Sequence, residues 1–547
     1  MNMKIRQYIN GMATTCLLAW GAWGLTGCAK EEHMDEYQPQ QEQKSKDTDQ
    51  EEPLSDEVSE KLNTIPGVSD VQIQVTQDGK EKGYYFAVDQ LIDHNDASKG
   101  TFKQRCFLSF EGYERPVVME TQGYAMADAI DDILDQDLVE YLKANYLEVE
   151  HRYFGKSLPE DFDNTDFTYL YTDQAAADLH SIVTLMQKHL FPRSNKWVAT
   201  GTSKGGITST LYAYYSDQND WDDIDLYIPF CAPFVTSKTS PCEDINIGWY
   251  LIARCGYGYE AGTTEAVAYQ RLCRIPAAIS GNEALRNACM REFHQSNPDM
   301  YQDILSAYDS DKMEQAATAG VIYTFYSNLF NKFSYIPFGL WAKYVPDPAK
   351  ATDADASDEE IQEMVNMVFQ TSEQLEKQLN PDEEEQASSR SPLMTDEEIL
   401  KIRKEDKTMP YSVQVMRELG NYRYDFQLVD GTFLTAQLAA DVAYLASTDY
   451  LYGTRYKGQW DGGKLMKAVR NWAKTEQTQP IIFVYSYNDP WTGAAIDDAV
   501  HNPTRQVWKV VNSIGTHDCA FLKENQCDVA ASKAIKDAIS AVLNLPD

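Results

Sequence analysis

The sequence has little positive charge and few cysteines for its 547 residues. Lysine and arginine together number 48 against 84 acidic residues, which gives a formal net charge of −36. A nucleic-acid binder needs a basic face to displace counterions from phosphates, so nucleic acid is excluded as a partner. Ten cysteines are too few for a disulfide scaffold of this size. The sequence also has no CxxC pair, HExxH motif, phosphate-binding loop or dinucleotide fingerprint, so we expect no metal and no organic cofactor.

Hydrophobic residues make up 43% of the chain, which is enough for a large core. A chain of this length predicts two or three packed units, or one large unit that carries an insertion.

Residues 1–27 have the features of an export signal. Lys4 and Arg6 precede an apolar run that is too short for a membrane-spanning helix, as a secretory signal is. The run ends in Leu25-Thr26-Gly27-Cys28, which resembles the bacterial lipobox, in which the cysteine thiol accepts the lipid. We therefore expect an exported lipoprotein, periplasmic or on the outer-membrane surface, that contacts the membrane through lipidated Cys28 only. A plain secretory signal with a chance cysteine is the alternative.

Residues 28–62 are polar and acidic, and they predict a solvated tether. Disulfides are expected after export. Spacing does not give their connectivity, although Cys519 and Cys527 are the nearest local pair.

The remaining sequence predicts an α/β-hydrolase fold in two halves. In residues 63–235, short β-rich runs alternate with helical stretches, including an expected helix over 127–144. This alternation indicates a mostly parallel sheet with helices on both faces. The pattern stops over residues 236–475, which we interpret as a helical cap insertion with an acidic segment at 353–385. It resumes in residues 476–547.

A candidate nucleophile lies in Gly201-Thr202-Ser203-Lys204-Gly205, which fits G-x-S-x-G. The motif directly follows an expected strand and opens an expected helix. A serine on such a tight turn has strained backbone angles, so its neighbours must be small. The pattern therefore predicts that Ser203 is catalytic. A glycine-rich packing turn is the structural alternative.

The hydrolase order of serine, acid and histidine selects the other two members of a triad. Of the eight histidines, only His501 and His517 come late enough, and His517 follows the last expected strand. Asp489 lies in the loop after the preceding strand and would orient the imidazole. Its rivals are Asp497, Asp498 and Asp518.

The oxyanion hole needs two backbone N–H groups. Lys204, as the residue after the nucleophile, supplies one by position. The second is expected from Gly123 or Tyr124, in the loop after an early strand. The Lys204 side chain is expected to be salt-bridged or solvated.

Several segments resemble one group of serine exopeptidases. The run Glu150-His151-Arg152-Tyr153-Phe154-Gly155-Lys156-Ser157-Leu158-Pro159 resembles a segment of the prolyl carboxypeptidase and dipeptidyl peptidase II group, as do the run from Thr172 to Leu179 and the loops Asp489-Pro490-Trp491 and Gly515-Thr516-His517. That group commonly has an aromatic residue after the serine. The Ser-Lys-Gly-Gly of this chain is similar instead to the secreted bacterial tripeptidyl aminopeptidases, a sister family.

This resemblance implies release of tripeptides from free N-termini of peptides, with Ser203, Asp489 and His517 as the triad. An aminopeptidase must pair the substrate ammonium with a carboxylate, for which Glu111, Glu120 and Glu150 are the candidates. A prolyl carboxypeptidase or dipeptidyl peptidase activity, an esterase or lipase, and a non-enzymatic glycan-binding surface lipoprotein are alternatives. The sequence does not fix the oligomeric state.

Overall fold

The computed structural model describes residues 55–77, 79–130, 137–158, 167–192, 196–236, 262–333, 345–370, 409–420, 433–445, 459–517 and 520–544. The predicted signal peptide, Cys28 and most of the predicted tether lie outside these ranges. Within them, no helix combines the length and the apolar character that are needed to cross a bilayer.

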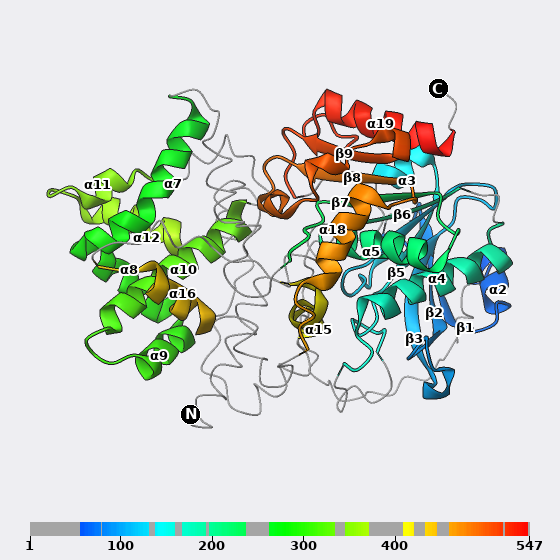
Figure 1. Ribbon diagram of the computed structural model, residues 1–547, viewed down its shortest axis with the longest axis horizontal. Helices are drawn as coiled ribbons and strands as arrows, with labels where there is room; N and C mark the ends of the chain where they lie inside the picture. The colour runs from blue at the N-terminus through cyan, green and yellow to red at the C-terminus, as the bar shows by residue number, and fades with distance from the viewer. Residues whose placement is uncertain are drawn as a thin grey trace, which may run out of the picture.

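The frame of the molecule is one nine-stranded sheet with the order β1-β2-β3-β5-β4-β6-β7-β8-β9 (Figure 1). The first three strands run antiparallel to their neighbours, and the other six are parallel to one another. The strands are β1 (Val68–Val75), β2 (Lys82–Leu91), β3 (Thr101–Ser109), β4 (Val117–Thr121), β5 (Asn145–Val149), β6 (Trp197–Thr202), β7 (Leu226–Phe230), β8 (Ile481–Ser486) and β9 (Val507–Asn512).

Helices cover both faces of this sheet, as the buried, nearly continuous apolar strands require. In β4, Val117 and Met119 point into one core and Val118 into the other, following the two-residue period of a strand. The first core is completed by α4 (Thr172–His189), α5 (Lys204–Asn219) and α18 (Lys464–Thr475). The second is completed by α3 (Asp137–Leu142) and α19 (Val529–Leu543). The predicted α/β-hydrolase fold is confirmed.

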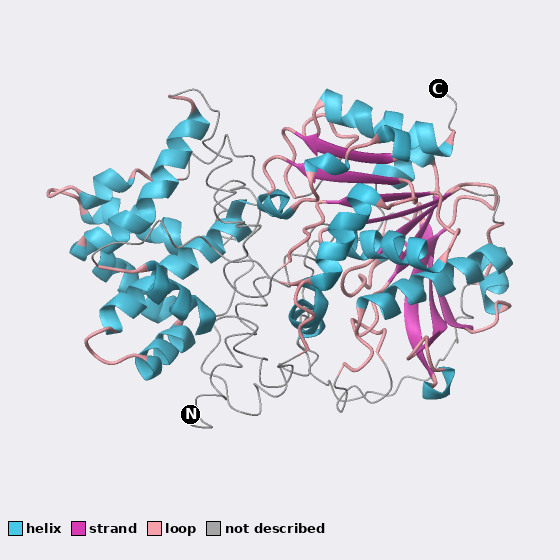
Figure 2. Cartoon of the chain, in the orientation of Figure 1, coloured by secondary structure: helices cyan, strands magenta, loops and turns pink. Residues whose placement is uncertain are grey.

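A separate group of helices forms the cap, to the left in Figures 1 and 2. Its helices surround an apolar core of their own, to which Leu272, Phe293 and Phe325 contribute. They are α7 (Thr264–Gly281), α8 (Glu283–Ser296), α9 (Pro298–Ala307), α10 (Met313–Phe333), α11 (Pro348–Thr352), α12 (Asp358–Phe369) and α16 (Ala436–Leu445). The cap core also includes Ala494 and is contacted by Trp491, which come from the loop after β8. The insertion therefore packs against the loop that carries Asp489.

Several boundaries differ from those predicted. The helix α2 (Glu57–Asn63) buries Val58 and Leu62 in the sheet core, so the hydrolase begins before the predicted tether ends. At the other end of the insertion, α18 buries Trp472 against the sheet and belongs to the hydrolase, although it falls in the segment predicted as cap.

One predicted helix is shorter than expected, and the acidic segment of the cap is helical in part. The expected helix over 127–144 is helical only from Asp137 to Leu142 among the described residues. Part of the acidic segment 353–385 is α12, which buries Met364 and Val368 on one face. An amphipathic helix places its acids on the solvent face, which accommodates the high charge of this segment.

The cysteines nearest in sequence, Cys519 and Cys527, do not pair. Cys527 is a buried free thiol, so it forms no disulfide with Cys519. Cys231, directly after β7, is disulfide-bonded.

Candidate active site

Ser203 occupies the sharp turn between β6 and α5. Its backbone has φ 57° and ψ −117°, a region that non-glycine residues rarely adopt. The turn is held by a hydrogen bond from the Ser203 N–H to the carbonyl oxygen of Phe230, 2.9 Å away at the end of β7. Such strain persists only where the surrounding structure fixes it, and it marks a functional site. The strand, turn and helix expected around G-x-S-x-G are all present.

The small flanking residues are required by close backbone approach. A Cβ added at Gly206 would lie 2.7 Å from the carbonyl oxygen of Phe230. The first turn of α5 can therefore pack directly on the end of β7, which sets Ser203 at the carboxyl edge of the parallel strands. Ligands of open α/β sheets bind at this edge.

Asp489 and His517 come together at the same edge. Asp489 follows β8, has no exposed surface, and places its Oδ2 3.0 Å from Nδ1 of the buried His517. The other carboxylate oxygen, Oδ1, accepts a hydrogen bond from the Trp491 N–H at 3.0 Å. The Trp491 ring lies against the imidazole, with ring centroids 4.8 Å apart. The carboxylate is thus fixed by its own turn beside Nδ1, and Nε2 is the ring nitrogen that remains for a reacting group.

Cys231 connects this pair to the nucleophile turn. Its sulfur, a carboxylate oxygen of Asp489 and a ring nitrogen of His517 all lie within 4.8 Å of one another. The residue before it, Phe230, accepts the hydrogen bond from Ser203. A disulfide sulfur is not the thiolate that a metal site requires, so the three residues do not form a metal centre.

The rival triad residues have other partners. His501 precedes β9 and accepts a hydrogen bond from the Lys509 N–H at 3.1 Å, at the opposite end of that strand. Asp497 pairs with Arg470 at 2.9 Å, and Asp498 pairs with Lys509 at 2.6 Å. Asp518 lies outside the described residues.

The predicted oxyanion loop packs directly on the start of α5. A Cβ at Gly123 would lie 2.7 Å from the Gly205 nitrogen and 2.8 Å from the Lys204 Cβ. The loop is tied down by a hydrogen bond from the His151 N–H to the Tyr124 carbonyl oxygen at 3.2 Å. Gly123, Tyr124 and Lys204 are therefore neighbours, as the prediction requires.

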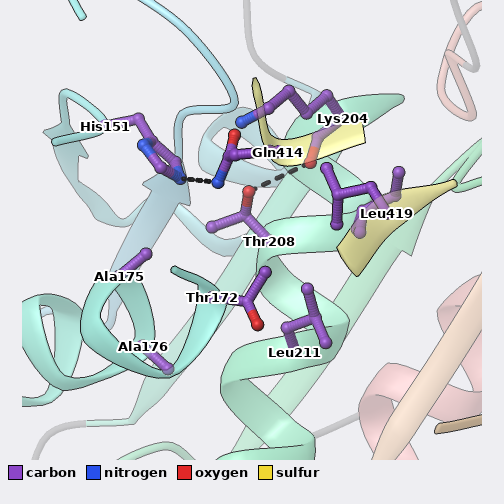
Figure 3. Close-up of a pocket in the computed structure, with 10 residues that line it drawn as sticks. His151, Thr172, Ala175, Ala176, Lys204, Thr208, Leu211, Gln414 and Leu419 are labelled. Atoms are coloured by element: carbon purple, nitrogen blue, oxygen red, sulfur yellow. Dashed lines mark hydrogen bonds between the residues drawn. The ribbon is translucent and has the colours of Figure 1, made fainter. Parts of the chain in front are cut away.

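Among the described residues the Lys204 side chain forms no salt bridge, and it is not solvated, which corrects the prediction. It is 3% exposed, and its ammonium donates a hydrogen bond to the Gly123 carbonyl oxygen. Burial holds the Lys204 pKa well below its usual value. Lys204 also lines a small pocket, shown in Figure 3. The pocket is lined by His151, Thr172, Ala175, Ala176, Lys204, Ile207, Thr208, Leu211, Gln414 and Leu419.

Two of the three glutamates proposed for substrate binding are unsuited to that role. Glu111 follows β3, whose end pairs with the beginning of β5, so it lies at the wrong edge of the sheet. Glu150 is fully buried and accepts hydrogen bonds from the Met126 and Lys156 N–H groups and from the Ser157 hydroxyl, at 3.0, 2.9 and 2.7 Å. It therefore fixes its own loop.

Glu120 lies near the correct edge, opposite Glu148 in the register of β4 and β5. It accepts a hydrogen bond from the Tyr146 hydroxyl at 2.6 Å. Burial raises the pKa of Glu120, and burial together with the charge of Glu120 raises the pKa of Glu148 well above its usual value. A carboxyl that tends to keep its proton offers little charge to an ammonium, so this pair is a poor ammonium site.

A buried ion pair between Arg152 and Asp178 joins the run from Glu150 to Pro159 to the run from Thr172 to Leu179. Neither residue was singled out as a candidate from the sequence. Nε and Nη2 of Arg152 donate to Oδ2 and Oδ1 of Asp178, in α4, at 2.6 and 2.7 Å. Both side chains are buried, at 0% and 1% exposure. His94 also contacts Asp178, at 2.7 Å. The signal was present in the sequence, because Arg152 and Asp178 each lie in a segment that carries the resemblance.

Comparison with known families supports the same assignment. Residues 51–246 match the family described as PS-10 peptidase S37. The resemblance to tripeptidyl aminopeptidase-type serine peptidases is confirmed. The S37-type segment contains Ser203, Lys204 and the Arg152–Asp178 pair, whereas Asp489 and His517 lie beyond it.

Individual relatives match segments of similar length. A prolyl tri/tetrapeptidyl aminopeptidase of Streptomyces mobaraensis is 31% identical over 168 residues, which are 30% of this chain and 32% of that protein. A prolyl carboxy peptidase like protein 5 of Caenorhabditis elegans is 32% identical over 162 residues, covering 27% and 31%. The chain thus spans about a third of the length of the curated relatives it matches. Candida antarctica lipase A superposes with a TM-score of 0.34 at 10% identity, over 89% of this chain and 85% of that one.

Replacing Asp178 should destabilise the fold strongly. D178A leaves the buried guanidinium of Arg152 without its carboxylate, and breaking such a pair costs about 3–5 kcal/mol. The free energy of unfolding, measured by urea denaturation, should fall by that amount. As a matched control, D537A removes an exposed pair with Lys533, which contributes about 0–1 kcal/mol. Equal effects of the two substitutions would contradict the role of the buried pair.

Proposed function

We propose that the protein is an exported, lipid-anchored serine exopeptidase that releases tripeptides from the free N-termini of peptides. The observation that carries the catalytic part is the Asp489 carboxylate 3.0 Å from His517 Nδ1, at the sheet edge where Ser203 sits in its strained turn. The match of residues 51–246 to S37 peptidases supports a peptidase over other uses of such a triad.

In the proposed mechanism, the Ser203 hydroxyl attacks the carbonyl carbon of the third residue of the substrate, while Nε2 of His517 takes the hydroxyl proton. Asp489 keeps the Nδ1 proton in place and stabilises the imidazolium that forms. The tetrahedral oxyanion is bound by the Lys204 N–H and a second N–H of the loop at Gly123 and Tyr124. His517 then gives the proton to the departing amine, which leaves a tripeptidyl ester on Ser203.

Water completes the cycle by attacking this ester. His517 removes a proton from the water, and the tetrahedral intermediate collapses with return of that proton to Ser203. The tripeptide leaves with a free carboxylate, and the enzyme is restored without a cofactor being consumed.

The cap supports action on chain ends rather than on internal bonds. It contacts the acid loop through Ala494 and Trp491, and Trp491 in turn lies against His517. A helical insertion at this place limits the directions from which a peptide can enter, as an exopeptidase requires. The preference for tripeptides and for the amino end is drawn from the resemblance.

Product analysis tests this specificity. A peptide of about ten residues with a free N-terminus should lose residues in steps of three, as measured by mass spectrometry, because the acyl group that Ser203 accepts contains the first three residues. N-acetylation should abolish cleavage, since it removes the ammonium. S203A serves as the inactive control. Trimming from the carboxyl end would favour the carboxypeptidase alternative, and cleavage of esters but not peptides would favour an esterase; either result contradicts the proposal.

Lipid anchoring has its own test. Cells that express the full chain and are fed radiolabelled palmitate should incorporate the label into the protein, because Cys28 ends a lipobox-like sequence. C28A should abolish the label and release the protein into the soluble exported fraction. C527A, which alters a buried free thiol, is the matched control and should keep the label. A labelled C28A protein would contradict the assignment of Cys28.

A further inference from the structure

The Lys204 ammonium is buried beside the nucleophile without a carboxylate partner among the described residues. Only burial shifts its pKa, with no contribution from an acid. Removing an ammonium from water costs several kcal/mol unless other groups replace the lost hydration. The contacts that the buried ammonium makes must therefore offset this cost.

Three groups replace part of the lost hydration. The ammonium donates to the Gly123 carbonyl oxygen, and it lies 5.3 Å from the ring centroid of Tyr124 and 5.0 Å from that of Phe154. These distances suit cation–π attraction. The two rings pack edge to face, with centroids 5.6 Å apart. The aromatic residues therefore form a fixed wall around the ammonium.

Gln414 adds a polar group on the far side of the pocket. Nδ1 of His151 lies 2.8 Å from the Arg152 carbonyl oxygen, which assigns its proton to Nδ1 and leaves Nε2 as an acceptor for the Gln414 amide N–H at 3.5 Å. This contact orients the Gln414 amide. Its oxygen is buried with no hydrogen bond of its own, and in Figure 3 the amide and the Lys204 ammonium reach into the same part of the pocket.

The bond to Gly123 has a directional consequence. In a trans peptide the C=O and N–H groups point in opposite directions. Because the ammonium of Lys204 holds the Gly123 carbonyl oxygen, it also fixes the direction of the Tyr124 N–H, which belongs to the same peptide group. Both neighbouring points of the loop are tied as well, by the Gln122 N–H to the Val149 oxygen at 3.3 Å and by the Tyr124 oxygen to His151.

We propose that the Lys204 side chain is a positioning residue that orients the Gly123–Tyr124 peptide so that the Tyr124 N–H is the second oxyanion donor. Lys204 then supplies one donor through its backbone and fixes the other through its ammonium. Of the two candidates for the second donor, Gly123 and Tyr124, the proposal selects Tyr124. The inference rests on the proposed function, because it assigns a role within the same serine-peptidase site.

The decisive variant is K204M. Methionine has a similar length and no charge, and replacing a buried charge with an apolar side chain is often neutral or stabilising for the fold. We expect an unchanged or higher melting temperature, a kcat for peptide hydrolysis lower by about 10²-fold, as for loss of one oxyanion donor, and a KM that changes little. K204R retains a cationic donor and should recover part of kcat. K188M, at an exposed position of α4, is the matched control and should leave kcat unchanged.

A second readout separates positioning from a general structural effect. A tripeptide aldehyde forms a tetrahedral adduct with serine, which places an oxyanion in the hole, whereas the product tripeptide does not. K204M should weaken binding of the aldehyde about 10²-fold and change binding of the product little, because only the adduct needs the oriented Tyr124 N–H.

Equal kcat values for K204M and the wild type, or equal weakening of aldehyde and product, would overturn the inference. If K204M does not fold, the same comparison with K204R decides: a partial loss of kcat, with aldehyde binding weakened more than product binding, supports the positioning role, and wild-type values or equal weakening of both ligands oppose it. Failure of the proposed function is distinguishable, because the wild-type protein itself would then neither hydrolyse peptides nor bind the aldehyde.

Discussion

The proposed activity depends on the buried Asp489 carboxylate facing His517 across the ends of two neighbouring parallel strands. Two other aspartate–histidine contacts occur among the described residues, His180 with Asp223 and His94 with Asp178, and both, at 2.7 Å, are shorter than the 3.0 Å between Asp489 and His517. Distance alone therefore does not distinguish a catalytic pair. The pair at Asp489 differs in its place, at the carboxyl edge where the sulfur of Cys231 and the turn at Ser203 meet it.

The architecture explains how residues nearly 300 positions apart come to share that edge. Parallel strands send all their carboxyl ends to one side of the sheet, so the loops after β4, β6, β7, β8 and β9 converge whatever their separation in the chain. The insertion between β7 and β8 can then be long without disturbing the sheet, because it begins and ends at this side. Its contact with Trp491, whose ring lies against His517, brings the cap next to the Asp489–His517 pair.

Local sequence patterns predicted what local physics determines. The strained turn at Ser203 and the acid and histidine loops follow from residue types and spacing, and the structure places them as expected. The burial of Lys204 could not be predicted in this way, because it depends on Tyr124, Phe154 and Gln414, which are far from it in sequence. The role of Glu111 was wrong for a similar reason: it depends on which direction β3 runs in the sheet. Similarly, the limits of the cap were misplaced at α18, where amphipathic periodicity identifies a helix but not the core that it joins.

Covalent labelling tests the central claim most directly. A fluorophosphonate probe reacts only with a serine hydroxyl that a neighbouring base activates, so intact-mass and peptide mass spectrometry of the labelled protein report whether Ser203 is such a group. The account predicts one adduct per chain, located on Ser203, absent in S203A and much slower to form in H517A and D489N. An unlabelled wild-type protein, or labelling of Ser203 at the wild-type rate in H517A, would contradict it.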